Sequence, residues 1–334
     1  MTVGALPTMF VFGRIVGRIE RGALPLCLLA MGCAAFWLAN ASDLVSIIIA
    51  LLLLGASSGA LDIALNLRVS TLERVDGLRL FDKAHAALPL AFLVASPAAG
   101  WLRDAGIGID TIFATAGGIL VLAGAWEWRA SAQGAGTLAT PVEPSEAALP
   151  GHVPALLLLL GGLGALGAFQ EMAATNWAAI HVVDVLSGSA TMGGLAPGMF
   201  MFGLFLGRLA ADRAGAGRED FSIIRVAALF GVPAFGLIAV SSFVPLTIVG
   251  FVIAGMAVGP IKPAIYRTVT RRAPDVARGA WLSIVTGTAY AGYLLSPAIL
   301  GPVAEYLGWT ALWGLTAFAG MMIISLTRMA RSGR

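Results

Sequence analysis

The chain has 334 residues, of which 58% are hydrophobic and only 12% are charged, and its mean hydropathy is +0.89. Soluble domains carry about 25% charged residues, so this composition excludes a soluble globular protein and indicates one that lies in a lipid bilayer. The net charge of +3 is small, and the positions of the basic residues explain it better than nucleic-acid binding, so we expect no nucleic-acid partner.

Apolar stretches long enough to cross a bilayer follow one another along the chain. A transmembrane helix needs roughly 20 mostly apolar residues to cross about 30 Å of hydrocarbon. We predict eleven such helices, five before and six after a polar segment at 129–153. In chain order they cover residues 1–19, 24–41, 44–67, 84–102, 109–128, 154–173, 191–211, 222–241, 244–267, 279–301 and 308–327.

The polar segment divides the predicted helices into two groups. Its sequence, RASAQGAGTLATPVEPSEAALPGH, is rich in Gly, Pro, Ala, Ser and Glu, which is typical of a linker. We therefore predict an all-α polytopic membrane protein with two pseudo-symmetric helical bundles. The N-terminal bundle covers 1–128, a cytoplasmic linker covers 129–153, and the C-terminal bundle covers 154–334.

Arginine and lysine residues gather in alternate loops between the predicted helices. Basic residues concentrate on the cytoplasmic side of membrane proteins, so the crowded loops predict that side. An odd number of helices then places residue 1 outside and residue 334 in the cytoplasm. We expect a multi-pass protein of the cytoplasmic (inner) membrane that works as a monomer.

The second half of the chain repeats segments of the first half in the same order. Residues 4–19 align without gaps with residues 194–209 and are identical at eight of sixteen positions. A shift of 200 positions aligns residues 55–66 with residues 255–266, and SPAAG from Ser96 with SPAILG from Ser296. Transporters are often built from two such halves, with the substrate site near the bilayer midplane. The repeat therefore predicts two related halves and favours transport.

Two of these repeated segments carry a resemblance to a known family. GRIERG at 17–22 and GRLAADRAG at 207–215 resemble the G-x-x-x-D-R-x-G loop of the major facilitator superfamily, which joins the second and third helices of each six-helix half. LDIALN at 61–66 resembles the acid-x-x-x-Asn pattern of the fourth helix in its fucose/proton symporter branch. QEMAATNW at 170–177 and AYAGYLLSPAILG at 289–301 are similar to the seventh and eleventh helices of that branch.

The resemblance implies the two-bundle fold of a secondary transporter. It also implies that this sequence lacks the family's first helix, because the loop at Gly17 would follow the second one. Three explanations stay open: a start codon farther upstream, a transporter of eleven helices, or a protein that does not transport.

Asp62 is the charged residue that stands out in the first group of helices. A charged side chain at the centre of a membrane helix costs about 2.5 to 3.5 kcal/mol on insertion scales, so it needs a role. Gly55, Gly59, Asp62 and Asn66 share one helix face, and we expect that face to point away from lipid. Asp62 is either a proton-coupling carboxylate or a member of a structural ion pair or hydrogen bond.

Lys262 holds the position in the second half that Asp62 holds in the first. It shares a helix face with Tyr266, and Pro260 and Pro263 beside it predict a bent or broken helix. Lys262 would bind an anionic substrate, pair with Asp62, or extend its ammonium group to the membrane interface.

Further polar residues occur near the ends of two helices. His85 either lines a cavity or caps its helix, and His152 and His181 are expected in loops or at the membrane interface. Glu171 is a candidate second coupling acid or gate residue, and Trp177 either stacks on a sugar ring or anchors its helix in the aromatic belt. The candidate cavity residues are Asp62, Asn66, His85, Gln170, Glu171, Asn176, Trp177, Lys262 and Tyr266.

The repeated loops predict gating contacts. An acid between arginines at a helix end forms charge-assisted contacts with a neighbouring helix in one conformation and loses them in another. The candidate gating residues are Gly17, Arg18, Glu20 and Arg21 in the first loop, and Gly207, Arg208, Asp212 and Arg213 in the second.

The sequence favours a secondary active transporter over an enzyme. It has no Ser/His/Asp arrangement, no phosphate-binding P-loop and no metal-ligand spacing, so we expect no catalysis, no metal and no cofactor. We expect a small polar solute, such as a sugar by the resemblance, and protons as partners. The alternatives are efflux of amphipathic compounds and a non-transporting membrane receptor or subunit.

Overall fold

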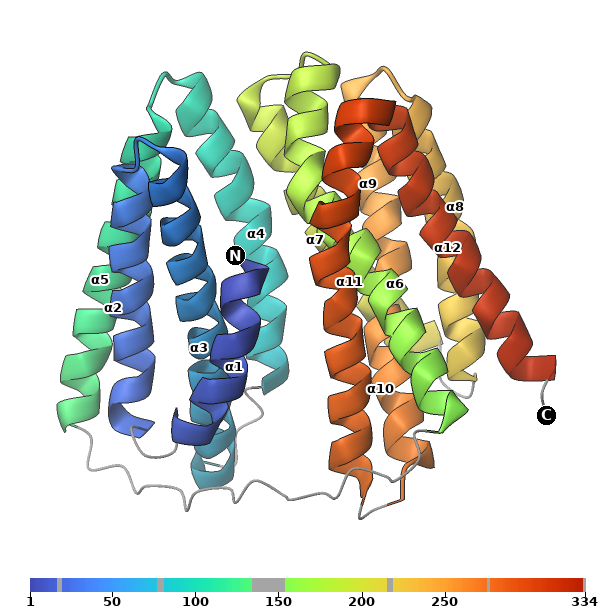
Figure 1. Cartoon of the computed structure of the whole chain (residues 1–334), viewed down its shortest axis with the longest axis horizontal. Helices are drawn as coiled ribbons and strands as arrows, with labels where there is room; N and C mark the ends of the chain where they lie inside the picture. The colour runs from blue at the N-terminus through green and yellow to red at the C-terminus, as the bar shows by residue number, and fades with distance from the viewer. Residues whose placement is uncertain (17–19, 77–80, 134–153, 215–218, 275–276, 333–334) are drawn as a thin grey trace. The chain divides into compact units, whose positions relative to one another are not determined.

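A computed structural model of the chain describes all residues except 17–19, 77–80, 134–153, 215–218, 275–276 and 333–334. The described residues form helices and short connections, with no strand among them. In chain order the helices are α1 (Thr2–Ile15), α2 (Glu20–Ala39), α3 (Leu44–Asp76), α4 (Phe81–Asp104), α5 (Ile109–Gln133), α6 (Ala155–Ile180), the π-helix η2 (His181–Val185), α7 (Ala190–Ala214), α8 (Asp220–Val240), α9 (Val244–Val258), α10 (Ile261–Arg272), α11 (Arg278–Leu307) and α12 (Trp309–Ser332) (Figure 1).

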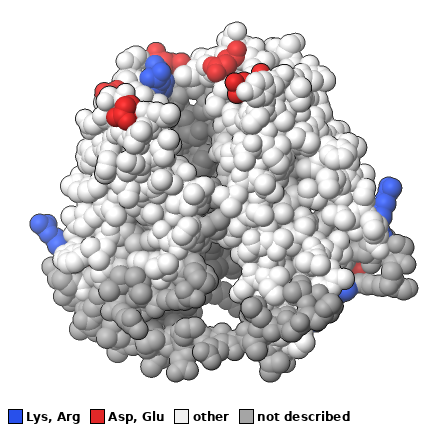
Figure 2. All heavy atoms as spheres, viewed as in Figure 1, with Lys and Arg blue, Asp and Glu red and all other residues white. Residues whose placement is uncertain are grey.

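These helices confirm the all-α fold, and helical structure occupies each of the eleven predicted segments. Each predicted span contains one α-helix, except that α9 and α10 together occupy the span predicted at 244–267. Nine segments of the described chain are long and apolar enough to cross a membrane by length and composition. Figure 2 shows few charged side chains on the described surface in this view, as expected for helices surrounded by lipid.

The chain divides into two compact units, and the division falls within α4. Unit 1 comprises Met1–Ala87 and Ala105–Ser145, and unit 2 comprises Leu88–Asp104 and Glu146–Arg334. The predicted bundle limits, 1–128 and 154–334, stay a prediction.

The sequence repeat is also a repeat of helix packing. In unit 1, a Cβ atom at Gly55 of α3 would overlap the carbonyl oxygen of Met1, beside α1. In unit 2, a Cβ atom at Gly255 of α9 would overlap the carbonyl oxygen of Phe200 in α7. Small residues allow helix backbones in a membrane to approach closely. The aligned glycines therefore hold equivalent helix pairs, α1 with α3 and α7 with α9, in their respective units.

Aromatic side chains form the centre of unit 2. Trp313 of α12 is fully buried, stacks on Phe235 of α8 with ring centroids 6.3 Å apart, and meets the edge of Phe251 of α9 at 5.3 Å. At one end of the unit, Asp104 of α4 accepts hydrogen bonds from the backbone N–H groups of Ala190 (2.9 Å) and Thr191 (2.8 Å). Because these amides begin α7, Asp104 caps that helix at its positive end.

Candidate functional site

Helices α6, α9, α10 and α11 of unit 2 line a small pocket with a free volume of about 30 Å³. Most of its wall is glycine, alanine, valine and isoleucine. Its polar side chains are Glu171 from α6, Lys262 and Tyr266 from α10, and Thr286, Tyr290 and Tyr293 from α11.

A break between α9 and α10 positions Lys262 at this pocket. α9 ends at Val258, and α10 begins again at Ile261 after Gly259 and Pro260. The backbone stays in the right-handed helical region, with φ −49° and ψ −46° at Gly259 and φ −72° and ψ −19° at Pro260. Pro260 has no N–H group for a helical hydrogen bond, so the predicted proline break is confirmed. Lys262 consequently lies in the first turn of α10.

Hydrogen bonds connect polar side chains across the pocket wall. The hydroxyl groups of Tyr266 and Thr286 are 3.1 Å apart and join α10 to α11. The side chains of Glu171 and Tyr293 are hydrogen-bonded and join α6 to α11. The rings of Tyr290 and Tyr293 have their centroids 5.7 Å apart. These contacts give the pocket a wall of phenolic groups with fixed positions.

Lys262 differs from its polar neighbours in having no such partner. Its side chain is exposed, and no carboxylate in the described part of the chain forms an ion pair with it. An ammonium group carries three hydrogen-bond donors and no acceptor. Lys262 therefore offers a positive charge to whatever enters the pocket.

The predicted polar cluster at 170–177 divides between two environments. Glu171 lines the pocket, whereas Gln170 is buried and donates a hydrogen bond from Nε2 to the carbonyl oxygen of Thr316 in α12 (3.1 Å). Trp177 packs edge to face on Trp309, with centroids 6.0 Å apart, and Asn176 is exposed. The structure therefore brings Glu171, Lys262 and Tyr266 together, and it places Gln170, Asn176 and Trp177 elsewhere in unit 2.

The predicted cavity residues of the first half belong to α3 and α4. On α3 the side chain of Asp62 is exposed and that of Asn66 is partly buried. Gly55 and Gly59, which lie on the same face of α3 as Asp62 and Asn66, pack against α1. The side chain of His85 in α4 lies outside the described residues.

The second predicted gating loop makes contacts between α7 and the α9–α10 break. Arg208 Nε donates to the carbonyl oxygen of Gly259 (3.4 Å), and a Cβ atom at Gly207 would overlap the carbonyl oxygen of Met256. Asp212 forms an ion pair with Arg267 of α10 (3.7 Å). Arg213 is exposed. In the first loop, Gly17 and Arg18 lie outside the described residues, as do the side chains of Glu20 and Arg21.

Asp220 is a contact residue that the sequence analysis did not identify. It is 6% exposed at the start of α8 and accepts hydrogen bonds from Arg267 Nε (3.0 Å), Arg271 Nη1 (3.2 Å) and the hydroxyl group of Thr268 (3.3 Å). The signal for this contact that the sequence offered was an acidic residue at the start of a helix, beside loops rich in arginine. Asp220 therefore ties α8 to α10 and shares Arg267 with Asp212.

His181 was expected in a loop or at the membrane interface, and this prediction was wrong. It lies in η2 and is only 3% exposed. Its ring centroid lies 5.5 Å from that of Trp309 and 5.6 Å from that of Trp313. The π-helix follows α6 without a turn and carries the imidazole ring into the aromatic core.

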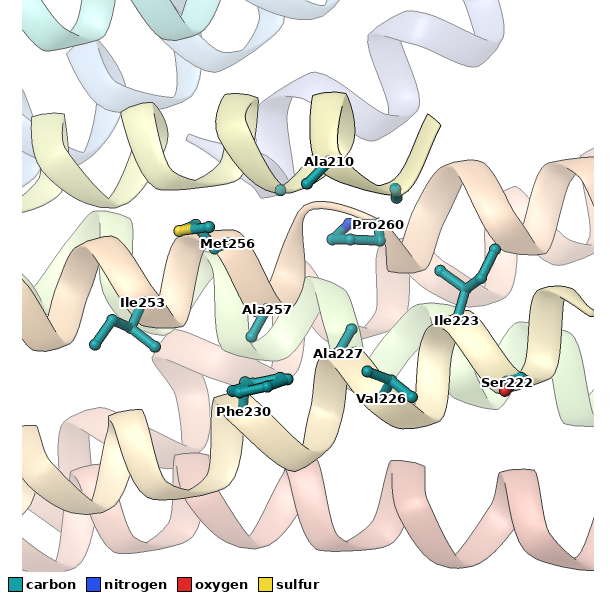
Figure 3. Close-up of a pocket in the computed structure, with 12 residues that line it drawn as sticks. Ala210, Ser222, Ile223, Val226, Ala227, Phe230, Ile253, Met256, Ala257 and Pro260 are labelled. Atoms are coloured by element: carbon teal, nitrogen blue, oxygen red, sulfur yellow. The ribbon is translucent and has the colours of Figure 1, made fainter. Parts of the chain in front are cut away.

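A second cavity in unit 2 has a different character. It measures about 270 Å³ and lies between α7, α8 and α9, where Phe230, Ile253 and Met256 contribute to an almost entirely apolar wall (Figure 3). Pro260 and Gly207, which lie beside the gating contacts, also line it. This wall suits hydrocarbon and offers a polar solute almost no hydrogen-bond partners.

Sequence comparison finds relatives among bacterial membrane proteins, although no family model matches the chain. An uncharacterized MFS-type transporter of Yersinia pestis is 24% identical over 287 residues, which is 85% of this chain and 71% of the relative. An uncharacterized transporter of Sinorhizobium fredii is 26% identical over 322 residues, which is 91% of this chain and 79% of the relative.

Solved transporter structures share the fold over nearly the whole chain. A bacterial homologue of the human lysosomal transporter Spinster, in an inward-facing and occupied conformation, has a TM-score of 0.72 at 14% identity and covers 99% of this chain and 89% of its own. The Escherichia coli fucose:proton symporter has a TM-score of 0.58 at 12% identity, covering 98% and 87%. The human organic anion transporter MFSD10 has a TM-score of 0.56 at 15% identity, covering 98% and 83%.

The sequence relatives are MFS-type and other membrane transporters, and the structural neighbours have the same helical fold. The chain is a multi-pass membrane protein that is similar in sequence to transporters, one of them of the MFS type, and has the helical fold of solved secondary transporters.

Proposed function

We propose that this transporter moves a small polar solute through the α6–α11 pocket and that a proton gradient drives the movement. The observation that carries the proposal is the set of six polar side chains, including one carboxylate and one ammonium group, that lines a pocket between apolar helices. Ionisable side chains in membrane segments are rare because they are expensive, and they usually serve a substrate or ion pathway.

Asp62 is the proposed site of the coupling proton. In the described part of unit 1 it is an acid within a membrane span, and no ion pair to it is formed there. A carboxylate within a membrane segment usually belongs to a substrate or proton pathway, which is the role proposed for Asp62. Asn66, one turn later on α3, is the proposed hydrogen-bond partner of the protonated acid.

Alternating access would require contacts that form in one conformation and break in another. The contacts of Arg208 with Gly259 (3.4 Å) and of Asp212 with Arg267 (3.7 Å) support this role for the second loop. Both contacts are long, and the one between Asp212 and Arg267 is largely exposed, so a small helix shift would break them. By the sequence repeat, we assign the same role to Gly17, Arg18, Glu20 and Arg21.

The proposed arrangement in the cell follows the charge distribution of the loops. The bundles at 1–128 and 154–334 would rock about the substrate site, joined by a linker at 129–153. The linker and the C-terminus would be cytoplasmic by the positive-inside rule. The protein would act as a monomer in the inner membrane.

Transport in proteoliposomes tests the coupling role of Asp62. In Asp62→Asn, exchange of labelled for unlabelled solute should continue, whereas accumulation driven by a proton gradient should fall to the equilibrium level. Asp110→Asn is the matched control, because Asp110 is an exposed acid in the first turn of α5. Equal loss of both activities, or unchanged accumulation, would remove Asp62 from the coupling step.

Efflux of amphipathic compounds is a second candidate function, favoured by the apolar cavity between α7, α8 and α9. In that case hydrophobic cations or anions should compete with the transported solute. Phe230→Ala, which enlarges this cavity, should change their inhibition constants and leave transport of polar solutes unaffected.

A further inference from the structure

The apolar cavity between α7, α8 and α9, which we call the α7–α9 groove, is open to the surroundings of these helices. Phe230 of α8 is 62% exposed and Met256 of α9 is 39% exposed, and both belong to membrane-spanning segments. The α7 wall has only small side chains, which keep the groove open: Gly207, Ala210 and Ala211. Among the described residues that line the groove, Ser222 alone has a polar side chain. The groove therefore suits a hydrocarbon chain of the surrounding lipid.

The length of the groove matches one leaflet of a bilayer. In Figure 3 its labelled residues run from Ser222 at one end to Ile253 at the other. Ser222 and Phe230 both line it from α8, and at 1.5 Å per residue they are separated by about 12 Å along the helix axis. Half of the hydrocarbon core of a bilayer measures about 15 Å. Ser222 lies near the start of the span Asp220–Val240, so the groove runs from the membrane boundary toward the midplane.

The width of the groove fits a single chain. A free volume of about 270 Å³ over a length of about 12 Å corresponds to a mean cross-section of about 22 Å². A helix with its side chains is about 10 Å across, so a helix of a second copy of the protein is too wide to enter. An extended acyl chain is narrow enough, and every methylene group that it buries there is favourable by about 0.8 kcal/mol.

Charged residues lie directly beyond the groove at the end where Ser222 is. Pro260 lines the groove at the start of α10, and Arg267 and Arg271 follow it at i+7 and i+11, on the same helix face. Arg267 forms ion pairs with Asp212 of α7 (3.7 Å) and Asp220 of α8 (3.0 Å). These ion pairs join the helices at the end of the groove, so an apolar chain inside it would meet a polar site at the membrane boundary.

Two arginines at this boundary have donors available for a phosphate group. Arg271 is 64% exposed and uses Nη1 for Asp220 (3.2 Å), and a guanidinium group carries five N–H donors. Arg272 is exposed and lies over the ring of Phe221 at 5.8 Å. Both arginines line a small hollow of about 120 Å³ at the start of α8, together with Thr268 and with the acids Glu219 and Asp220. Arginine binds phosphate through paired hydrogen bonds.

We propose that the α7–α9 groove binds one acyl chain of a membrane phospholipid whose phosphate group is held by Arg271 and Arg272. The chain packs against Gly207 and Pro260, beside the break between α9 and α10. The lipid is a bound neighbour of these helices and not a transported solute. The site is separate from the α6–α11 pocket, so the inference does not depend on the proposed transport of a polar solute.

Native mass spectrometry of the delipidated protein in detergent tests the groove. Dioleoylphosphatidylglycerol is titrated, and the affinity for the first bound lipid is obtained from the populations of free and bound protein. Ala210→Phe places a ring in the groove and should weaken this affinity at least about tenfold, the loss expected when about two methylene groups are displaced. Val226→Phe, which fills the groove from α8, should have the same effect.

The matched control is Ala30→Phe. It makes the same change at an exposed alanine of α2, in unit 1, and should bind the lipid as the wild type does. Wild-type protein that binds no lipid, unchanged affinity in both groove variants, or an equal loss in Ala30→Phe would overturn the proposal. A dimer that Ala210→Phe dissociates would identify a second copy as the occupant and would also overturn it.

The phosphate contact is tested with a lipid that lacks the phosphate. Dioleoylglycerol has the same chains and should bind the wild type about 25-fold more weakly than the phospholipid, because it loses two cation contacts that each contribute about fivefold. Arg271→Ala and Arg272→Ala should each weaken phospholipid binding about fivefold and leave dioleoylglycerol binding unchanged. Arg328→Ala removes an exposed cation at the far end of α12 and should bind both lipids as the wild type does. Equal affinities for the two lipids, or equal losses in all three arginine variants, would refute the assigned phosphate site.

Discussion

Replacement of Asp220 by alanine should destabilise the protein more than replacement of any exposed acid. The Asp220 side chain is 7% exposed and accepts hydrogen bonds from two arginines. Arg267 is 32% exposed, so its charge-assisted bond contributes about 1.5 to 3 kcal/mol. Arg271 is 64% exposed, and its bond contributes about 0 to 1 kcal/mol because solvent screens it.

The hydroxyl group of Thr268 adds little to this sum. It also donates to the carbonyl oxygen of Ala264 (3.0 Å), so it keeps a partner when Asp220 is removed. The free energy of unfolding of Asp220→Ala should therefore be lower than that of the wild type by about 1.5 to 4 kcal/mol. The loss should be a general one, because Asp220 joins the start of α8 to α10.

The assay is thermal unfolding of the purified protein in detergent, supported by equilibrium unfolding in mixed micelles. Asp212→Ala is the matched control, because Asp212 contacts the same Arg267 but is 68% exposed, and it should cost no more than about 1 kcal/mol. The reasoning would be refuted by equal effects of the two substitutions, or by an Asp220→Ala protein as stable as the wild type.

Three further substitutions test other contacts of unit 2. Gly255→Val places a side chain against the backbone of α7 and should lower the free energy of unfolding by about 1 to 3 kcal/mol or more. Gly236→Ala is the control, because no atom lies within 4 Å of the added Cβ atom, and it should lower the free energy of unfolding by a smaller amount in the same assay. The Thr191 hydroxyl group and the amides of Thr191 and Ala190 lower the pKa of Asp104 to about 2. Because this pKa lies below the value of an unfolded carboxyl group, the stabilisation by Asp104 is complete above about pH 4 and is lost as pH falls through about 2. Asp104→Ala should therefore lower the melting temperature equally at pH 6 and pH 8. A different loss at the two pH values would contradict this assignment. Gln170→Met removes the hydrogen bond to the carbonyl oxygen of Thr316, which keeps its place in the hydrogen-bond ladder of α12, so it should cost about 0.5 to 1.5 kcal/mol by the same measurement without altering solute affinity.

The number and position of the membrane helices could be predicted from the sequence because they depend on local properties. A segment in lipid must satisfy its own backbone hydrogen bonds and must be apolar over its whole length. Both requirements can be recognised within a window of about 20 residues. The proline break was predictable for the same reason, because Pro260 removes a hydrogen-bond donor from its own helix.

The sequence repeat predicted two related halves, and the structure shows equivalent helix packing in both. Gly55 and Gly255 occupy matching positions: Gly55 of α3 meets the backbone at Met1, beside α1, and Gly255 of α9 meets the backbone of α7. A glycine admits close approach whatever its partner helix is. Which helices pair, and which of them line a pocket, therefore followed only from the structure.

Only the tertiary structure decided which polar residues share the candidate site. Gln170 and Glu171 are neighbours in sequence, yet successive helix positions differ by about 100°, so one reaches α12 and the other reaches the pocket. Tyr290 and Tyr293 lie more than a hundred residues from Glu171 and join it only because α11 packs beside α6. Helices that are apolar on every side carry no pattern that marks their protein-facing side, and that side is set by packing alone.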